Sequence, residues 1–478
     1  MHFTSTSFAI FLPVVFLLYW FVASKNLTVQ NALLLSASYF FYACWDVRFL
    51  ALLLFSTLLD YVMGLQIQKT ISPVNRKKWL WLSVGINLGL LAIFKYYNFF
   101  AASFAVALQQ LGLHVSLHTL NIILPVGISF YTFHGLSYIL DVYHRKINAE
   151  KDFTAYALFV SFFPLLVAGP IERATHLLPQ LKKQRNFYYQ NAADGLRQMI
   201  WGFFKKIVIA DQCAGYVSNA FNHTSVLTGS TLAAGAILFA IQIYADFSGY
   251  SDIALGTARL FGIELLRNFA FPYFSKNMAE FWRRWNISLS SWFRDYVYIP
   301  LGGSRVSTAK KIRNVFIIFL LSGLWHGANW TFVAWGFLNA LYVLPIVMFS
   351  SSGSNQQVAA NTKYPDGIKS FLSMVITFAM AVAGWIFFRS ASIADAFTYF
   401  DSIFSLSLFT VPQALSKKLW LCMAIFVAAE WAGRHQQYAL ARLGFKWRRA
   451  VRWAFYYGII LSILYFSGTH QPFIYFQF

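Results

Sequence analysis

The sequence predicts an all-α, polytopic membrane protein with roughly ten to twelve transmembrane helices and additional re-entrant or interfacial helices. Of its 478 residues, 58% are hydrophobic and only 12% are charged, whereas soluble domains carry about 25% charged residues. The apolar runs are continuous and do not alternate with polar residues, which favours helices over a barrel. The net charge is +21, and the basic residues lie in short loops between these runs. There they are expected to set the topology and to contact anionic lipid, and they do not indicate nucleic-acid binding.

The apolar runs follow one another along most of the chain. The first run has no basic residue before it except the N-terminus, since the first lysine is Lys25, and we expect it to be retained as a helix. Basic loops at 69–78 and 434–452 are expected on the cytoplasmic side, which places both termini on the outer side. The expected ordinary spans are 8–22, 31–43, 49–65, 79–94, 99–113, 195–210, 371–388, 419–432 and 453–466.

Two apolar runs contain prolines and glycines. Pro125, Gly127 and Gly135 interrupt the run 121–140, and three more such residues interrupt 159–170. We expect broken or re-entrant helices there, with simple kinks as the alternative.

The run 232–261 contains two carboxylates. Asp246 and Asp252 are costly in a membrane unless they pair or face a cavity. Arg259 is seven positions after Asp252 and is a candidate partner on the same helical face. Buried polar contacts between helices explain these residues as well as direct chemistry does.

Residues 279–296 have the pattern of one amphipathic helix, either at the membrane interface or along a cavity. Its polar stripe would contain Arg283, Asn286, Ser290 and Arg294. Its aromatic stripe would contain Trp282, Trp285, Leu289 and Trp292.

His326 lies deep in the apolar stretch 316–335. On one continuous helix, Ser322, His326 and Asn329 share a face, while Gly323 and Gly327 allow a second helix to approach closely. A helix that starts near residue 313 places His326 roughly 20 Å along its axis, so the ring needs a cavity. It is either a functional residue or a structural histidine that joins two helices.

The remaining signals are weak. Cys44, Cys213 and Cys422 are solitary, which predicts neither a disulfide framework nor a metal site. No internal repeat is visible, and such repeats are typical of secondary transporters. The aromatic tail 473–478 is an interfacial anchor or a partner contact.

Several motifs resemble the membrane-bound O-acyltransferases, and within them the bacterial alginate O-acetyltransferase branch, which also contains cellulose and peptidoglycan acetylating proteins. The resemblance covers almost the whole chain. It rests on FWRRWNISLS at 281–290, WFRDY at 292–296, IPLGG at 299–303, GLWHGANW at 323–330, LPVGISFYTF at 124–133, VAGPI at 167–171 and FIYFQF at 473–478.

The resemblance implies a single membrane-embedded domain over 1–478, with a catalytic core at about 121–345 and helices around a central tunnel. His326 matches the family's catalytic histidine. Asn286 matches a second site residue, which is histidine in many members of this branch. Asparagine there indicates a hydrogen-bonding residue and not a second base.

The implied activity is O-acetylation of an exported polysaccharide at the bacterial inner membrane. Alginate is the first expectation, with cellulose or peptidoglycan as alternatives. Acetyl-coenzyme A would be the cytoplasmic donor, with no permanently bound cofactor, and Arg283, Arg294 and Arg305 are candidate contacts for its phosphates. The expected partner is a periplasmic transferase of the SGNH-hydrolase type. The alternative is a non-catalytic transporter or scaffold of a polysaccharide export complex.

Overall fold

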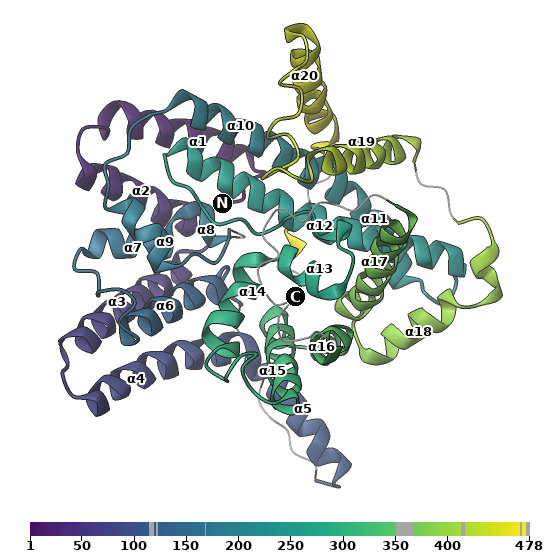
Figure 1. The fold of residues 1–478 in the computed structure, drawn as a ribbon, viewed down its shortest axis with the longest axis horizontal. Coiled ribbons are helices and arrows are strands. Elements are labelled where there is room, and N and C mark those ends of the chain that lie inside the picture. Colours follow the sequence, from purple (N-terminus) through teal and green to yellow (C-terminus); the bar gives the residue numbers. More distant parts are fainter. Residues whose placement is uncertain are drawn as a thin grey trace. The chain divides into compact units, whose positions relative to one another are not determined.

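The computed structural model describes residues 1–113, 119–120, 123–167, 169–349, 367–412, 416–468 and 471–474, and over these ranges it is helical without strands (Figure 1). The chain divides into two compact units. Unit 1 contains Met1–Gly195 and Thr257–Leu266, and unit 2 contains Leu196–Gly256 and Arg267–Phe478. The all-α expectation is confirmed, and the single embedded domain with a core at 121–345 stays a prediction.

Unit 1 is built from the N-terminal helices, of which α1, α2, α3 and α7 begin at a polar side-chain cap. Asn26 and Asp46, for example, accept backbone N–H groups at the starts of α2 and α3. The helices are α1 (Thr6–Leu17) with η1 (Leu18–Val22), α2 (Leu27–Ala43), α3 (Val47–Lys69), α4 (Pro73–Leu91) with η2 (Ala92–Tyr96), α5 (Tyr97–Gln110), α6 (Ile128–Tyr143), α7 (Phe153–Ser161), α8 (Phe163–Leu166), α9 (Ala174–Leu181) and the start of α10 (Tyr189–Phe203).

The expected breaks are confirmed at Gly127 and between α7 and α8 of unit 1, whereas Gly135 lies inside the continuous α6. α6 begins only after Gly127, which has a left-handed φ of 75°. A Cβ on Gly127 would lie 2.3 Å from the carbonyl oxygen of Leu166, so only glycine fits this turn. The run 159–170 is likewise divided between α7 and α8.

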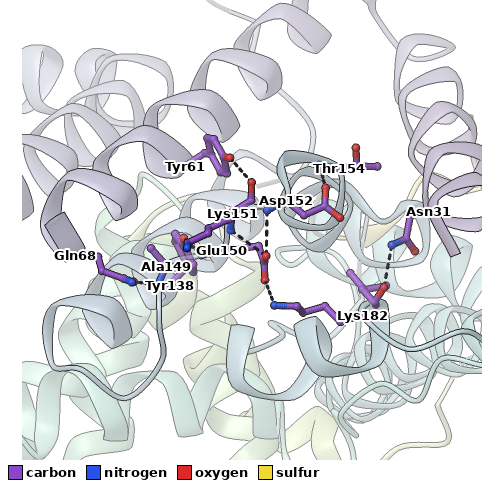
Figure 2. Close-up of polar contacts among 11 residues, drawn as sticks. Asn31, Tyr61, Gln68, Tyr138, Ala149, Glu150, Lys151, Asp152, Thr154 and Lys182 are labelled. Atoms are coloured by element: carbon purple, nitrogen blue, oxygen red, sulfur yellow. Dashed lines mark hydrogen bonds and ion pairs between the residues drawn. The ribbon is translucent and has the colours of Figure 1, made fainter.

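Glu150 joins three helices of unit 1 (Figure 2). Its carboxylate accepts the N–H groups of Lys151 at 2.9 Å and Asp152 at 3.1 Å, and it pairs with Lys182 Nζ at 2.9 Å after α9. The hydroxyl of Tyr138 in α6 accepts the N–H of Glu150 at 2.9 Å. These contacts hold the α6–α7 loop against the end of α9.

Unit 2 contains the second half of the chain. Its elements are the end of α10, η3 (Phe204–Ala210), α11 (Asp211–Asn222), α12 (Gly229–Leu260) up to Gly256, η4 (Pro272–Phe274), α13 (Met278–Arg284), α14 (Ile287–Phe293), η5 (Arg294–Tyr298), α15 (Thr308–His326), α16 (Trp330–Phe349), α17 (Ile368–Arg389), α18 (Ile393–Ile403), η6 (Leu406–Phe409), α19 (Lys417–Gly433) and α20 (Arg449–Phe466).

Within the described ranges, five helical segments are long and apolar enough to cross a membrane. The expected spans at 79–94 and 99–113 form one continuous helical segment, because no breaker separates them. The expected span at 195–210 is not among the five, since it carries the buried Lys205 and Lys206. The five segments are Val47–Lys69, Pro73–Gln110, Gly229–Leu260, Trp330–Met348 and Ile368–Arg389.

The carboxylates of α12 are paired with lysines. Lys205 Nζ lies 2.6 Å from Asp252, and Lys206 Nζ lies 2.9 Å from Asp246. The expected Asp252–Arg259 pair is wrong, because η3 brings Lys205 closer, and Arg259 pairs instead with carboxylates of unit 1. The pairing supports a structural function for both aspartates.

The described part of the C-terminal tail is buried in unit 2, and the yellow end of the chain lies against α12 (Figure 1). Ile474 donates its N–H to Asp246 at 2.6 Å, and Gln471 accepts from Lys206 at 3.0 Å. Phe473 is fully buried and its ring lies 4.6 Å from that of Tyr250. Residues 473 and 474 are therefore core residues and not an interfacial anchor, while 475–478 lie outside the described residues.

Candidate active site

His326 is the last residue of α15, where the chain turns into α16. Gly327 is extended, with φ −161°, and the next helix begins at Trp330. The prediction that Ser322, His326 and Asn329 share one face of one helix is correct for Ser322 and His326 but wrong for Asn329. Asn329 accepts the N–H of Thr331 and donates to the carbonyl of Ala391, both at 3.0 Å, because the helix has already ended.

α15 and α16 pack at very short range, as the small residues predict. A Cβ on Gly323 would lie 2.3 Å from the carbonyl oxygen of Phe332, and one on Gly327 would lie 2.1 Å from its ring. On α16, a Cβ on Gly336 would lie 2.3 Å from the carbonyl oxygen of Phe319. Only glycine permits this approach, which brings Trp335 beside His326.

The His326 ring is enclosed by aromatic side chains from three helices. It is 3% exposed, and it meets Trp335 of α16 and Phe388 of α17 edge to face, with ring centroids 5.1 and 5.4 Å away. Trp325 covers it from α15 at 5.0 Å. These contacts hold the imidazole in one orientation.

Asn286 occupies a strained turn between α13 and α14. Its φ of 42° and ψ of 57° are left-handed, a conformation in which asparagine and histidine are enriched among residues other than glycine. Backbone hydrogen bonds hold the turn on both sides, from Ala270 to Arg284 and from Ile287 to Asn268, both 2.9 Å. The expected single amphipathic helix is therefore wrong, because the chain breaks at Asn286.

The break directs the predicted polar stripe into a cavity of about 270 Å³. The cavity brings Asn286 and His326 together and is also lined by Ser322 of α15. Arg305 does not line it and lies in an exposed turn. The remaining lining residues are Trp282, Arg283, Ile287, Leu289, Ser290, Ser291, Phe293, Arg294, Ile318 and Phe319.

The polar groups of this cavity differ in their partners. Asn286 Nδ2 is buried and has no hydrogen-bond acceptor among the side chains and backbone that the structure describes. Arg294 pairs with its neighbour Asp295 at 2.8 Å. The cavity thus combines an enclosed imidazole, an amide donor that needs an acceptor, and two arginines, Arg283 and Arg294.

These groups can carry out acyl transfer to a hydroxyl. An imidazole can act as a general base near neutral pH, because the unperturbed pKa of histidine is about 6.5. The orphaned amide N–H can bind a carbonyl oxygen, and the arginines can bind an anion. The analysis of the sequence missed Phe388, because nothing in the local pattern of α17 indicates that it reaches His326.

Comparison with known proteins agrees with this chemistry. The model of the membrane-bound O-acyltransferase family matches residues 147–388. The probable alginate O-acetylase AlgI of Pseudomonas putida is 35% identical over the full length of both chains. That of Pseudomonas aeruginosa is 39% identical over 85% of this chain and 75% of the relative. The peptidoglycan O-acetyltransferase of Helicobacter pylori is 36% identical over 81% of this chain and 76% of the relative.

The matched family region contains the whole cavity, from Trp282 to His326, and also Phe388. The full-length similarity extends the match to unit 1 and to the C-terminal tail. This chain therefore belongs to the membrane-bound O-acyltransferase family, and it is a multi-pass membrane enzyme that transfers acyl groups to oxygen.

Proposed function

We propose that this enzyme passes acetyl groups from cytoplasmic acetyl-coenzyme A across the inner membrane for O-acetylation of an exported polysaccharide, with alginate as the first candidate. The observation that carries the proposal is the shared cavity of His326 and Asn286. The alginate and peptidoglycan acetylating relatives support an exported polymer as the final acceptor.

In the proposed reaction, His326 removes the proton from the acceptor hydroxyl as its oxygen attacks the thioester carbon. Asn286 Nδ2 donates a hydrogen bond to the carbonyl oxygen, on which negative charge develops. The tetrahedral intermediate collapses, the carbon–sulfur bond breaks, and the proton held by His326 passes to the thiolate. The reaction is balanced in protons, so the cavity needs no separate proton outlet.

Arg283 and Arg294 are the proposed contacts for the phosphates of the donor, because both line the cavity. Arg294 would exchange its exposed ion pair with Asp295 for a phosphate, and exposed ion pairs contribute little. Arg305 lies outside the cavity, so a phosphate contact there is proposed only for a part of the donor that extends beyond it.

We further propose that the protein has roughly ten to twelve membrane spans around a central tunnel, with both termini on the periplasmic side. A periplasmic transferase of the SGNH-hydrolase type would take the acetyl group to the polymer. Membrane lipids surround the apolar helices, and nucleic acid has no part in the function.

The decisive experiment measures polymer acetyl content in cells that express His326→Ala at the wild-type membrane level. We expect acetylation to be lost, since the described residues that line the cavity offer no second histidine or carboxylate as a base. Retained acetylation would overturn the proposal and favour a non-catalytic transporter or scaffold. Identification of the acetylated polymer by ester analysis separates alginate from cellulose and peptidoglycan.

A second experiment tests the donor. Ser322 lines the cavity beside His326, so Ser322→Cys should react with small polar thiol reagents. Acetyl-coenzyme A on the cytoplasmic face should slow that reaction. If the cysteine reacts but the donor gives no protection from either face, acetyl-coenzyme A is not the immediate donor.

A further inference from the structure

The segment after α17 exposes large apolar side chains outside the candidate spans. Phe404, Leu406, Phe409 and Val411 are 76%, 91%, 87% and 91% exposed, and Phe397 in α18 is 57% exposed. We call these five residues the α18 patch. Large exposed apolar side chains that gather in one short segment are typical of an interaction surface.

α18 has three distinct faces, since successive residues are about 100° apart around a helix. The buried face packs into a core cluster of unit 2, where the hydroxyl of Tyr399 donates to the carbonyl of Leu232 at 2.8 Å. A second face is apolar and exposed, and the third is polar and exposed. The buried face contains Ala396, Tyr399 and Ile403. The exposed apolar face contains Phe397 and Phe404, and the exposed polar face contains Asp395, Thr398 and Asp401.

Two hydroxyl groups attach the loop after α18 to the start of α12. Ser407 accepts the N–H of Gly229 at 2.7 Å, and Thr410 contacts Ser230 at 3.2 Å. A Cβ on Gly229 would lie 2.6 Å from the carbonyl oxygen of Ile403, so the loop is held tightly against the start of α12. Ser407 and Thr410 thus bond to the start of α12, whereas Leu406, Phe409 and Val411 are exposed.

The loop also lies where two candidate spans end. α12 begins at Gly229, to which the loop is hydrogen-bonded, and α17 ends at Arg389, just before α18. Figure 1 shows α18 beside α17 at the edge of unit 2. The patch is therefore continuous with the surface at which spanning helices leave the bilayer, and this identifies lipid as the occupant.

We propose that α18 and η6 form an interfacial anchor that lies in the plane of the membrane surface. The α18 patch inserts about 5–10 Å, to the boundary between headgroups and acyl chains, as amphipathic interfacial helices do. Asp395, Thr398 and Asp401 remain in water on the other exposed face. The anchor fixes the depth and the tilt of α12 and α17. It does not depend on the proposed acetyl transfer.

The test uses the full chain alone in lipid nanodiscs, with a spin label on one introduced cysteine. Cys44 and Cys422 are replaced by serine, while Cys213 is kept because it is fully buried. Phe397→Cys and Thr398→Cys form a matched pair, since they are neighbours on one helix and both are exposed. Phe409→Cys and Asp401→Cys form a second pair.

We measure collision of each label with oxygen, which partitions into lipid, and with a water-soluble nickel complex. The ratio of oxygen to nickel collisions should be several-fold higher at 397 and 409 than at 398 and 401. Equal, water-like ratios at all four positions would overturn the proposal. In that case the patch is exposed when the chain is alone, and it is a docking surface for another protein.

Discussion

Replacement of Gly323 by alanine tests whether the α15–α16 contact positions His326, the proposed general base. The new Cβ would lie 2.3 Å from the carbonyl oxygen of Phe332, about 1 Å inside ordinary van der Waals contact. This obstacle is backbone, so no side-chain rotation relieves it, and α16 must move. α16 carries Trp335, whose ring is 5.1 Å from that of His326.

We expect the overpacking in Gly323→Ala to cost about 1–3 kcal/mol of stability. Acetyl transfer should fall further, by up to about 10²-fold, because a shift of about 1 Å in a reacting group has that effect. The assays are thermal unfolding of the purified protein and polymer acetylation at matched membrane levels.

The matched control is Gly458→Ala in the interior of α20, where an added Cβ meets nothing within 4 Å. There alanine should stabilise the helix by about 0.5–1 kcal/mol. The two substitutions are chemically identical but should shift Tm in opposite directions. If Gly323→Ala raises Tm as Gly458→Ala does, or leaves acetylation unchanged, the close packing does not position His326.

Three further predictions concern single residues. Asn286→Ala should lower acetyl transfer by about 10²–10³-fold through loss of an oxyanion donor, whereas Asn286→His should retain it, since histidine also accepts the left-handed turn. Lys206→Met should cost about 3–5 kcal/mol in thermal unfolding, because it leaves the buried Asp246 without its cation. The hydrogen bond that His176 Nδ1 donates to the Glu172 carboxylate raises the pKa of His176 above 6.5. The stabilising contribution of this pair is therefore full below pH 6.5 and is lost as pH rises through the raised pKa. The Tm difference between wild type and His176→Gln should therefore shrink over that range.

Each of these outcomes can fail independently. Unchanged turnover of Asn286→Ala would show that the amide does not touch the reacting carbonyl. Lys205→Met is the comparison variant for Lys206→Met. If the Tm of Lys206→Met equals that of the wild type, the buried carboxyl group of Asp246 is neutral. A Tm difference for His176→Gln that grows with pH would reverse the assigned sign of the linkage.

The amino-acid sequence by itself determined the class of the protein and indicated His326 as the main candidate residue. Whether a segment partitions into lipid depends on the side chains of that segment alone. Composition and continuous apolar runs therefore predict a helical membrane protein without a structure. The same holds for the broken runs, since Gly127 and the prolines restrict the backbone wherever they occur. His326 stands out because a polar ring in an apolar run is costly anywhere.

Tertiary structure decided the partners of these residues. The turn at Asn286 depends on backbone hydrogen bonds with Asn268 and Ala270, and the enclosure of His326 depends on Phe388 from another helix. Lys205, not Arg259, pairs with Asp252, because η3 packs against α12. The face of α18 that stays exposed was likewise decided by its packing on α12. Periodicity shows which residues share a face, but only the packed neighbours decide what that face contacts.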